Sequence, residues 1–166
     1  MIRYLLVVLA HLSVVSVSAA DFDTPIPMRG KGAATYYVEG HLAGIGPTEF
    51  MVDTGSGYLA ISQDALDTLL TQQRARYVKD LLGVLANGNE MVVPVYSIDE
   101  LTIGRRCKLK NVEAAIFPGK NRFILGLSAL QKAAPFIFSL DPPTLALSNC
   151  SQKTDPAWLT TRKGGL

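Results

Sequence analysis

Short runs of apolar and β-prone residues, separated by glycine and proline turns, follow one another from residue 34 onward. Each run has the length and residue types of a short strand. Strands are expected at 35–42, 49–52, 58–61, 77–86, 90–98, 100–103, 108–117, 123–126, 136–140 and 144–148. Turn residues at 44–47, 104–106 and 141–143 separate neighbouring runs.

Helical spacing is confined to two short segments. Ser62 is a predicted N-cap, and Leu66, Leu69 and Leu70 repeat at helical spacing up to about residue 73. A second short helix is expected over 128–134, which a proline follows. Many short strands with little helix predict a mainly β domain, either a barrel or a sandwich.

The first twenty residues have the character of a leader. Arg3 gives a positive start, the run 4–17 is almost wholly apolar, and Ser18-Ala19-Ala20 supplies small residues for a cleavage site. We therefore predict a signal peptide at 1–20 and export to the periplasm or the medium. The apolar run is shorter than the roughly 20 residues of a spanning helix. An uncleaved membrane anchor is the alternative, and a membrane contact is expected in that case alone.

The remaining chain is expected to hold one domain. Prolines and glycines predict an extended N-terminal arm at 21–33, followed by the folded domain at 34–150 and a flexible polar tail at 151–166. Hydrophobic residues make up 48% and charged residues 18%, which excludes a disordered chain. The formal net charge is +2 and the basic residues are scattered, so no nucleic-acid partner is expected.

Two cysteines, Cys107 and Cys150, suit an exported protein. In oxidising surroundings they are candidates for one structural disulfide. Their separation in space does not follow from the sequence, so two unpaired thiols stay open as the alternative. There is no Cys-x-x-Cys motif, and beyond the leader His41 is the sole histidine. Neither a metal site nor a cofactor is expected.

The segment 50–57, Phe-Met-Val-Asp-Thr-Gly-Ser-Gly, holds the candidate chemistry. Asp53 follows three apolar residues of a predicted strand, at the point where the chain leaves the core. Gly55 and Gly57 permit backbone turns that residues with a β-carbon resist. We therefore expect Asp53 at the edge of a desolvated pocket, held by local hydrogen-bond donors. The alternative is an aspartate that merely starts a turn.

Two further features lie at consistent distances along the chain. Asn87-Gly88 joins two extended runs and is a strong hairpin signal, and Phe-Ile-Leu-Gly at 123–126 precedes the second predicted helix. With Asp-Thr-Gly at 53–55, these features make the chain from about residue 36 to 147 resemble the retropepsin-like aspartic proteases, especially exported bacterial members of clan AA. The resemblance implies a mainly β, closed barrel-like acid-protease fold with one or two short helices.

The resemblance also implies an aspartic endopeptidase with two catalytic carboxyl groups. Asp53 supplies one, and the chain holds no second Asp-Thr-Gly or Asp-Ser-Gly. The other is therefore expected from a second copy across the axis of a homodimer. Two carboxyl groups this close share one proton. The charged group would activate a water molecule, and the protonated one would polarise the scissile carbonyl of a polypeptide.

Other roles follow from the resemblance by position. The Thr54 hydroxyl would tie the two active loops together across the axis. Gly55 would let the substrate backbone approach, and Ser56 would donate a hydrogen bond to the catalytic carboxylate. Gly57 and Ile124 are further candidates for the substrate site, with Ile124 in the core or in the pocket wall.

The resemblance also implies that the hairpin 84–92 closes over substrate as a flap, with Ala86, Asn87 and Gly88 at its tip. An ordinary surface hairpin is the alternative. Substrates are expected to be extended polypeptides with apolar side chains near the cut, because the predicted pocket walls are apolar.

The chain departs from viral members of the family in two respects. Viral chains carry an aspartate soon after Asp-Thr-Gly and an arginine after the later glycine, where this chain has Gly57 and Leu127. The ionic link near the dimer interface is therefore missing. A terminal hairpin at 136–148 also follows the second helix, and it either forms the interface differently or covers that face within one subunit. A catalytically silent peptide-binding domain of the envelope is the second hypothesis, and self-association distinguishes it from the protease.

Overall fold

Strands dominate the computed structural model, which describes residues 22–32, 34–84, 90–118 and 123–150. The strands are β1 (Thr24–Pro27), β2 (Arg29–Gly30), β3 (Tyr36–Leu42), β4 (Gly46–Val52), β5 (Leu59–Ser62), β6 (Ala75–Val84), β7 (Glu90–Ile103), β8 (Cys107–Phe117), β9 (Phe123–Leu125), β10 (Phe136–Leu140) and β11 (Pro143–Leu147). The helices are α1 (Gln63–Thr71) and α2 (Leu127–Leu130), and a 3-10 turn, η1 (Gln131–Ala133), follows α2. The predicted mainly β class with two short helices is confirmed.

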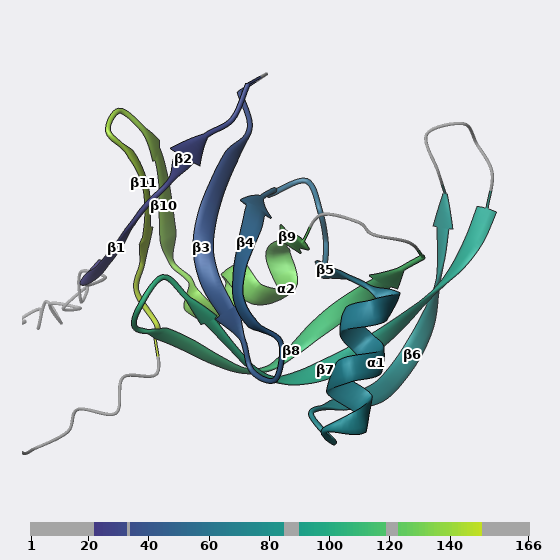
Figure 1. Cartoon of the computed structure of the whole chain (residues 1–166). Coiled ribbons are helices and arrows are strands. Elements are labelled where there is room, and N and C mark those ends of the chain that lie inside the picture. Colours follow the sequence, from purple (N-terminus) through teal and green to yellow (C-terminus); the bar gives the residue numbers. More distant parts are fainter. Residues whose placement is uncertain (1–21, 33, 85–89, 119–122, 151–166) are drawn as a thin grey trace, which may run out of the picture.

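Six strands form a closed barrel. Neighbouring strands pair in the order β3-β4-β9-β5-β8-β7, and β7 pairs again with β3 through Gly40–Ile103, His41–Thr102 and Leu42–Leu101. This last pairing closes the ring (Figure 1). β2 and β6 extend the sheet beyond β3 and β7. The fold is therefore the closed barrel that the resemblance implied, and not a sandwich of two open sheets.

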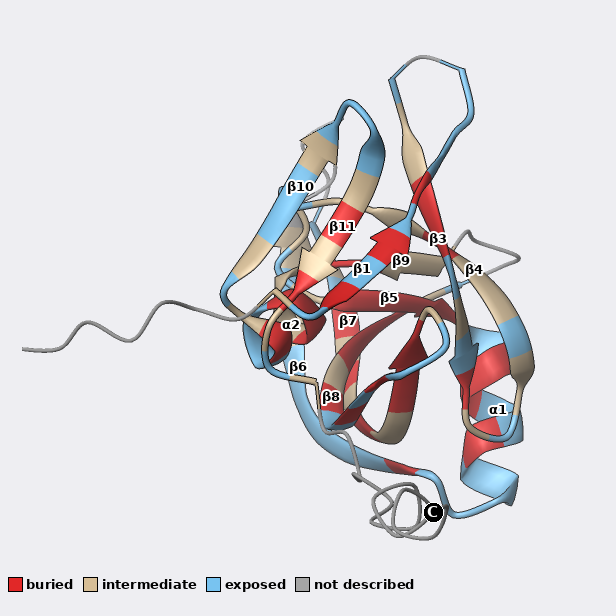
Figure 2. Cartoon of the chain, turned by 90° about the vertical axis from the view of Figure 1, so that its left-hand side faces the viewer, coloured by how far each residue is buried: buried red, intermediate tan, exposed pale blue. Residues whose placement is uncertain are grey.

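The barrel interior holds the apolar faces of these strands. Phe50, Leu59, Ile61, Leu101 and Leu125 are fully buried there. Burial of each such side chain contributes about 1.5–3 kcal/mol to folding. Figure 2 shows that β5 is buried along its length, whereas much of α1 faces solvent. The core thus includes buried side chains of β4 and β5, the two strands that flank residue 53.

The first helix begins as its sequence predicts. The Ser62 side chain accepts a hydrogen bond from the Ala65 N–H at 3.3 Å, so it is the N-cap. Leu66 and Leu69 are buried against the barrel, and Leu70 is exposed. The spacing of these leucines therefore places one apolar face on the core.

Among the element boundaries that differ from the prediction, those of β7 and β4 differ most. β7 is one strand where two were expected. The chain stays extended through Asp99, and the Asp99 N–H donates to the Arg74 carbonyl at 3.0 Å. β4 begins at Gly46, inside the predicted turn, because Gly46 pairs with Leu42. The reversal of the chain is completed within three residues, and the Ile45 N–H donates to the Leu42 carbonyl at 2.9 Å.

A separate three-stranded sheet lies beside the barrel, in the order β1-β11-β10. β1 comes from the segment expected to be an extended arm, and it pairs antiparallel with β11 from Thr24–Leu147 to Pro27–Thr144. The terminal hairpin β10–β11 therefore packs with the N-terminal strand of its own subunit. β10 is left as an edge strand within the described part of the chain.

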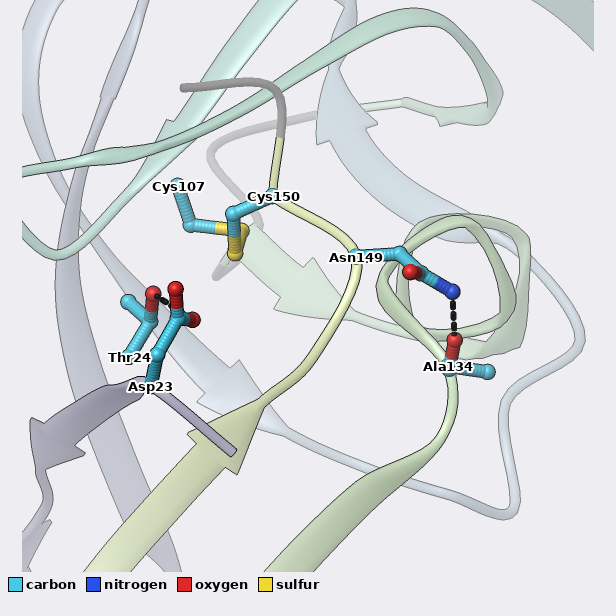
Figure 3. Close-up of a disulfide and its surroundings, with 6 residues drawn as sticks. All are labelled: Asp23, Thr24, Cys107, Ala134, Asn149 and Cys150. Atoms are coloured by element: carbon cyan, nitrogen blue, oxygen red, sulfur yellow. Dashed lines mark hydrogen bonds between the residues drawn. A yellow bond between two sulfur atoms is a disulfide. The ribbon is translucent and has the colours of Figure 1, made fainter. Parts of the chain in front are cut away.

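Cys107 and Cys150 are joined by a disulfide (Figure 3). Cys107 is fully buried at the start of β8, and Cys150 follows β11. Beside it, the Asn149 side chain donates a hydrogen bond to the Ala134 carbonyl. The bridge therefore ties the end of the terminal hairpin to the barrel. Within the described residues, no helix combines the length and apolar character needed to cross a membrane.

Replacement of both cysteines by alanine should lower the free energy of unfolding by about 4 kcal/mol, because the bridge closes a long loop with a sequence separation of 43. Urea unfolding of the two proteins measures the difference. A reductant should shift the wild-type midpoint and leave the double variant unchanged. Equal midpoints for wild type and variant would contradict a stabilising bridge.

Candidate active site

Asp53 lies where β4 leaves the barrel, and its side chain is half-buried. Its backbone N–H donates to the Leu125 carbonyl at 3.1 Å, which anchors the residue to β9. Its carboxylate accepts a hydrogen bond from the Gly55 N–H at 2.9 Å. The carboxylate is therefore oriented by its own loop at the rim of the core.

The strand β9 separates the two strands that flank this loop. It pairs parallel with β4, from Phe50–Phe123 to Val52–Leu125, and antiparallel with β5 through Ala60–Ile124. Residues 53–58 thus connect two strands that are not hydrogen-bonded to each other. Because both flanking strands are held by β9, the ends of the loop have fixed positions (Figure 1).

The start of α2 is hydrogen-bonded to the backbone of the loop. The Leu127 N–H donates to the Ser56 carbonyl at 2.8 Å, and the Ser128 N–H donates to the Gly57 carbonyl at 3.0 Å. A Cβ on Gly126 would overlap the Tyr58 carbonyl group and lie 2.8 Å from the Ser56 carbonyl oxygen. The close approach of the two backbones therefore requires glycine at 126.

Ser128 has a positioning role that the sequence analysis missed. Its hydroxyl donates to the Glu113 carbonyl at 2.6 Å and accepts from the Leu59 N–H at 2.7 Å. It thereby connects α2, β5 and β8, three elements far apart in the sequence. The residue looked like an ordinary serine at a helix start, and no local pattern distinguishes it.

Ser56 differs from its predicted role. Its hydroxyl donates to the Tyr58 carbonyl at 2.9 Å and not to the carboxylate of Asp53. The Ser56 hydroxyl has a single hydrogen, which the Tyr58 carbonyl accepts, and the Gly55 N–H donates to the carboxylate. The expected donor to the carboxylate is present, but it is a main-chain group.

The remaining predicted residues fall into three groups. Thr54, Gly55 and Gly57 are exposed on the loop, and Thr54 makes no side-chain hydrogen bond within the described part of the chain. Ile124 lies half-buried in β9, between β4 and β5. The predicted flap residues Ala86, Asn87 and Gly88 lie outside the described residues.

A cleft of about 310 Å³ adjoins the loop. One side is the loop itself, and the other side is the sheet formed by β6, β7 and β8. Its lining is mainly apolar and consists of Ser56, Gly57, Tyr58, Leu81, Leu82, Gly83, Met91, Val93, Ala115 and Phe117. β6 and β7 pair antiparallel up to Val84–Glu90, so the strands that lead to residues 85–89 form this side of the cleft.

A lysine stands beside one cleft residue. The Lys79 ammonium lies 3.3 Å from the Glu113 carboxylate and 5.5 Å from the centre of the Tyr58 ring. The pKa of Lys79 is raised above its ordinary value. The largest cause is a hydrogen bond to the Tyr58 side chain, and the next is a hydrogen bond to the Glu113 carboxylate. The group therefore stays charged at neutral pH, next to an otherwise apolar cleft.

A larger groove of about 1030 Å³ lies elsewhere, between the N-terminal strands, the β3–β4 hairpin and the turn after β7. No residue of the loop 53–58 lines it. Among the residues that the structure describes, no three His, Cys, Asp or Glu side chains gather as a metal site would need.

Comparison with known proteins gives matches to a family and to a solved structure. The model of the family described as gag-polyprotein putative aspartyl protease matches residues 38–132, more than half of the 166 residues. The crystal structure of a retropepsin-like aspartic protease from Rickettsia conorii has a TM-score of 0.53 and 21% identity, and the match covers 75% of this chain and 88% of that one. At this identity the likeness is one of fold. No curated protein matches the chain.

Proposed function

Because this chain belongs to the gag-polyprotein aspartyl protease family, with a retropepsin-like fold, we propose that it is a homodimeric aspartic endopeptidase. The observation that supports this activity is the position of Asp53. Its carboxylate is oriented by the Gly55 N–H on an exposed loop, and Ser56, Gly57 and Tyr58 of the same loop line an apolar cleft. A protein that merely binds peptides needs no carboxyl group at that point.

In the proposed dimer, the two Asp53 carboxyl groups meet at the two-fold axis and share one proton. The charged group takes a proton from water while the water oxygen bonds to the carbonyl carbon of the substrate. The protonated group gives its hydrogen to the carbonyl oxygen. The carboxyl group that took the proton from water then passes it to the peptide nitrogen as the carbon–nitrogen bond breaks. A hydroxyl of the diol intermediate returns its proton to the other carboxylate, so the pair again shares one proton. The exposed Thr54 and Gly55 are available to contact the second loop and the substrate backbone.

The terminal hairpin supplies a surface for the second copy. Ile137, Phe138 and Leu140 of β10 are large apolar residues with exposed fractions of 47%, 37% and 58%. An edge strand with apolar side chains is a site for pairing with another chain. In Figure 1 the β10–β11 hairpin, the loop after β4 and the ends of β6 and β7 all lie toward the same side. We place the dimer interface along this side.

Leu140→Asp should weaken the dimer at least tenfold, because the new carboxylate would have to be desolvated in the interface. Sedimentation at several protein concentrations measures the dissociation constant. Peptidase activity should fall most at low concentration and recover at high concentration. Leu70→Asp, at a 41% exposed position on α1, is the matched control. An unchanged dimer in the Leu140 variant would exclude β10 from the interface.

The activity itself is tested with denatured casein over a pH series from acid to neutral, at several protein concentrations. Cleavage that rises faster than linearly with protein concentration would support catalysis by a dimer. A folded dimer without cleavage at any pH would favour the catalytically silent peptide-binding domain.

We further propose that the protein is exported to the periplasm or the medium. The leader-like segment 1–20 and the disulfide support this location, since structural disulfides persist in oxidising compartments. Fractionation of producing cells, with N-terminal sequencing of the product, would show whether the chain is cut before Asp21.

A further inference from the structure

The groove of about 1030 Å³ between β1, the β3–β4 hairpin and the turn after β7 has no part in the proposed reaction. Its volume is at the upper end of the range of ligand sites, about 300–1,000 Å³. None of its lining residues belongs to the loop 53–58. The groove therefore has room for several residues of a polypeptide, at a place separate from the proposed catalytic centre.

One part of the groove carries two arginines. Arg105 and Arg106 are exposed in the turn between β7 and β8, and neither forms an ion pair within the described part of the chain. Arg29 also lines the groove, but it is bonded to Glu39 at 2.8 Å and to Glu49 at 3.2 Å. The charge of Arg29 is thus balanced, whereas the two arginines of the turn are available to a carboxylate.

The strand β1 gives the groove an edge of hydrogen-bond acceptors. Within the described residues β1 pairs with β11 on one side only, and the whole of β1 lines the groove. The Met28 N–H donates to the Pro143 carbonyl of β11 at 3.0 Å. Because successive residues of a strand alternate, the carbonyls of Pro25 and Pro27 point away from β11. Proline has no N–H, so this edge can accept a hydrogen bond from a side chain but cannot complete a ladder with a guest strand.

The chain continues from a point beside this groove. Cys150, the last described residue, is joined to Cys107, and Cys107 directly follows Arg106. Figure 3 shows Asp23 and Thr24, which line the groove, in the surroundings of the disulfide. The segment that follows the disulfide therefore starts next to the arginines of the groove.

The segment 151–166 holds side chains that complement the two parts of the groove. Asp155 is five residues beyond Cys150, and five extended residues reach at most about 18 Å. Its carboxylate is a partner for the arginines of the turn. Trp158 follows three residues later, and its indole N–H can donate but not accept. An indole thus suits an edge that offers carbonyl groups alone, and its ring suits the prolines that surround them.

We propose that this groove is a binding site for the chain's own segment 155–159. The Asp155 carboxylate pairs with the two arginines of the turn. The Trp158 ring lies along β1, and its indole N–H donates to a proline carbonyl of that strand. The disulfide holds the segment beside its site, and this high effective concentration favours binding within one chain. The site selects a carboxylate followed by an aromatic donor, and it does not depend on the proposed peptidase activity.

Trp158 is the sole tryptophan of the chain, so tryptophan fluorescence reports on this contact alone. Acrylamide quenching of the folded protein is compared with quenching of the isolated peptide 151–166. In the protein the indole should be about threefold less accessible to acrylamide and should emit at a shorter wavelength, because the groove shields the ring from water. Equal quenching in protein and peptide would overturn the inference.

Charge reversal tests the predicted ion pair. Arg105→Glu with Arg106→Glu should raise the quenching nearly to that of the peptide, and so should Asp155→Lys alone. The three changes together restore opposite charges and should recover most of the protection, as coupled residues do. Lys110→Glu with Lys132→Glu alters the net charge equally at two exposed positions outside the groove. This matched control should leave the quenching unchanged.

Two other outcomes would contradict the proposal. Protection that survives all the charge reversals would mean that the indole is bound elsewhere on the protein. Protection that increases with protein concentration would mean that the segment occupies the groove of a second copy and not its own. Loss of protection on reversal, with recovery in the combined variant at any protein concentration, is the expected result.

Discussion

Asp53→Asn is expected to abolish peptide hydrolysis and to leave the chain folded and dimeric. Asparagine has nearly the same shape, and its amide oxygen can still accept the hydrogen bond from the Gly55 N–H. It cannot take a proton from water or hold the shared proton of the pair. Loss of general acid–base catalysis alone lowers rates by about 10²–10⁴-fold. Casein cleavage by equal amounts of the two proteins measures the loss, with circular dichroism and sedimentation as checks of fold and assembly.

The proposed sharing of one site between two subunits adds a sharper test. Addition of excess Asp53→Asn to wild type should suppress activity, because most wild-type chains would then be in mixed dimers. At equal amounts, about one quarter of randomly assorted dimers keep two aspartates. Asp64→Asn, on the exposed first turn of α1, is the matched control and should neither lose nor suppress activity. Activity in the Asp53 variant, or its failure to suppress wild type, would contradict the shared pair.

Gly126→Ala is expected to prevent stable folding. The added Cβ would overlap the Tyr58 carbonyl group and lie 2.8 Å from the Ser56 carbonyl oxygen, and neither can turn away as a side chain would. Those atoms lie in the loop whose Ser56 carbonyl accepts from Leu127 N–H at 2.8 Å. Backbone overlap at a buried position belongs to the few changes that cost more than about 4 kcal/mol. Since small domains have about 5–15 kcal/mol in total, most of the stability should be lost.

Soluble yield and urea unfolding of the purified variant measure this effect. Gly30→Ala is the matched control, since a Cβ there would meet its nearest described neighbour, a Tyr36 ring carbon, at 3.6 Å. That variant should unfold within about 1 kcal/mol of wild type. A Gly126→Ala protein as stable as the control would mean that the loop and α2 are less closely packed than the structure has them.

The Asp53→Asn and Gly126→Ala variants test different properties of the protein. The Asp53 variant keeps the fold and removes the proposed chemistry, so it reports on function. The Gly126 variant acts on the contact between loop and helix, so it reports on how the site is held. If Gly126→Ala folds but is inactive, the position of the loop matters more for catalysis than for stability.

Much of the local structure could be predicted from the sequence alone. Alternating apolar residues, turn residues and the N-cap Ser62 depend on neighbours within a few positions, and these interactions act in any context. The strands from β3 onward, both helices and the exposed loop after β4 follow from such patterns, whereas β1 and β2 lie in the segment that was expected to be an extended arm. The position of Asp53 at the end of an apolar strand was predictable for the same reason.

Tertiary structure decided the contacts between distant segments. The closure of the barrel by β3 and β7, the partners of Ser128 and the disulfide join residues far apart in the chain, and no local pattern reports their distance. The error at Ser56 has a local cause, because its hydroxyl has a single hydrogen and the Tyr58 carbonyl accepts it. Local patterns along the chain were sufficient to predict most of the strands and the position of the carboxyl group at the end of one of them. Packing decided what lies opposite the loop, because the cleft is formed by the loop, β6, β7 and β8, which meet only in the folded chain.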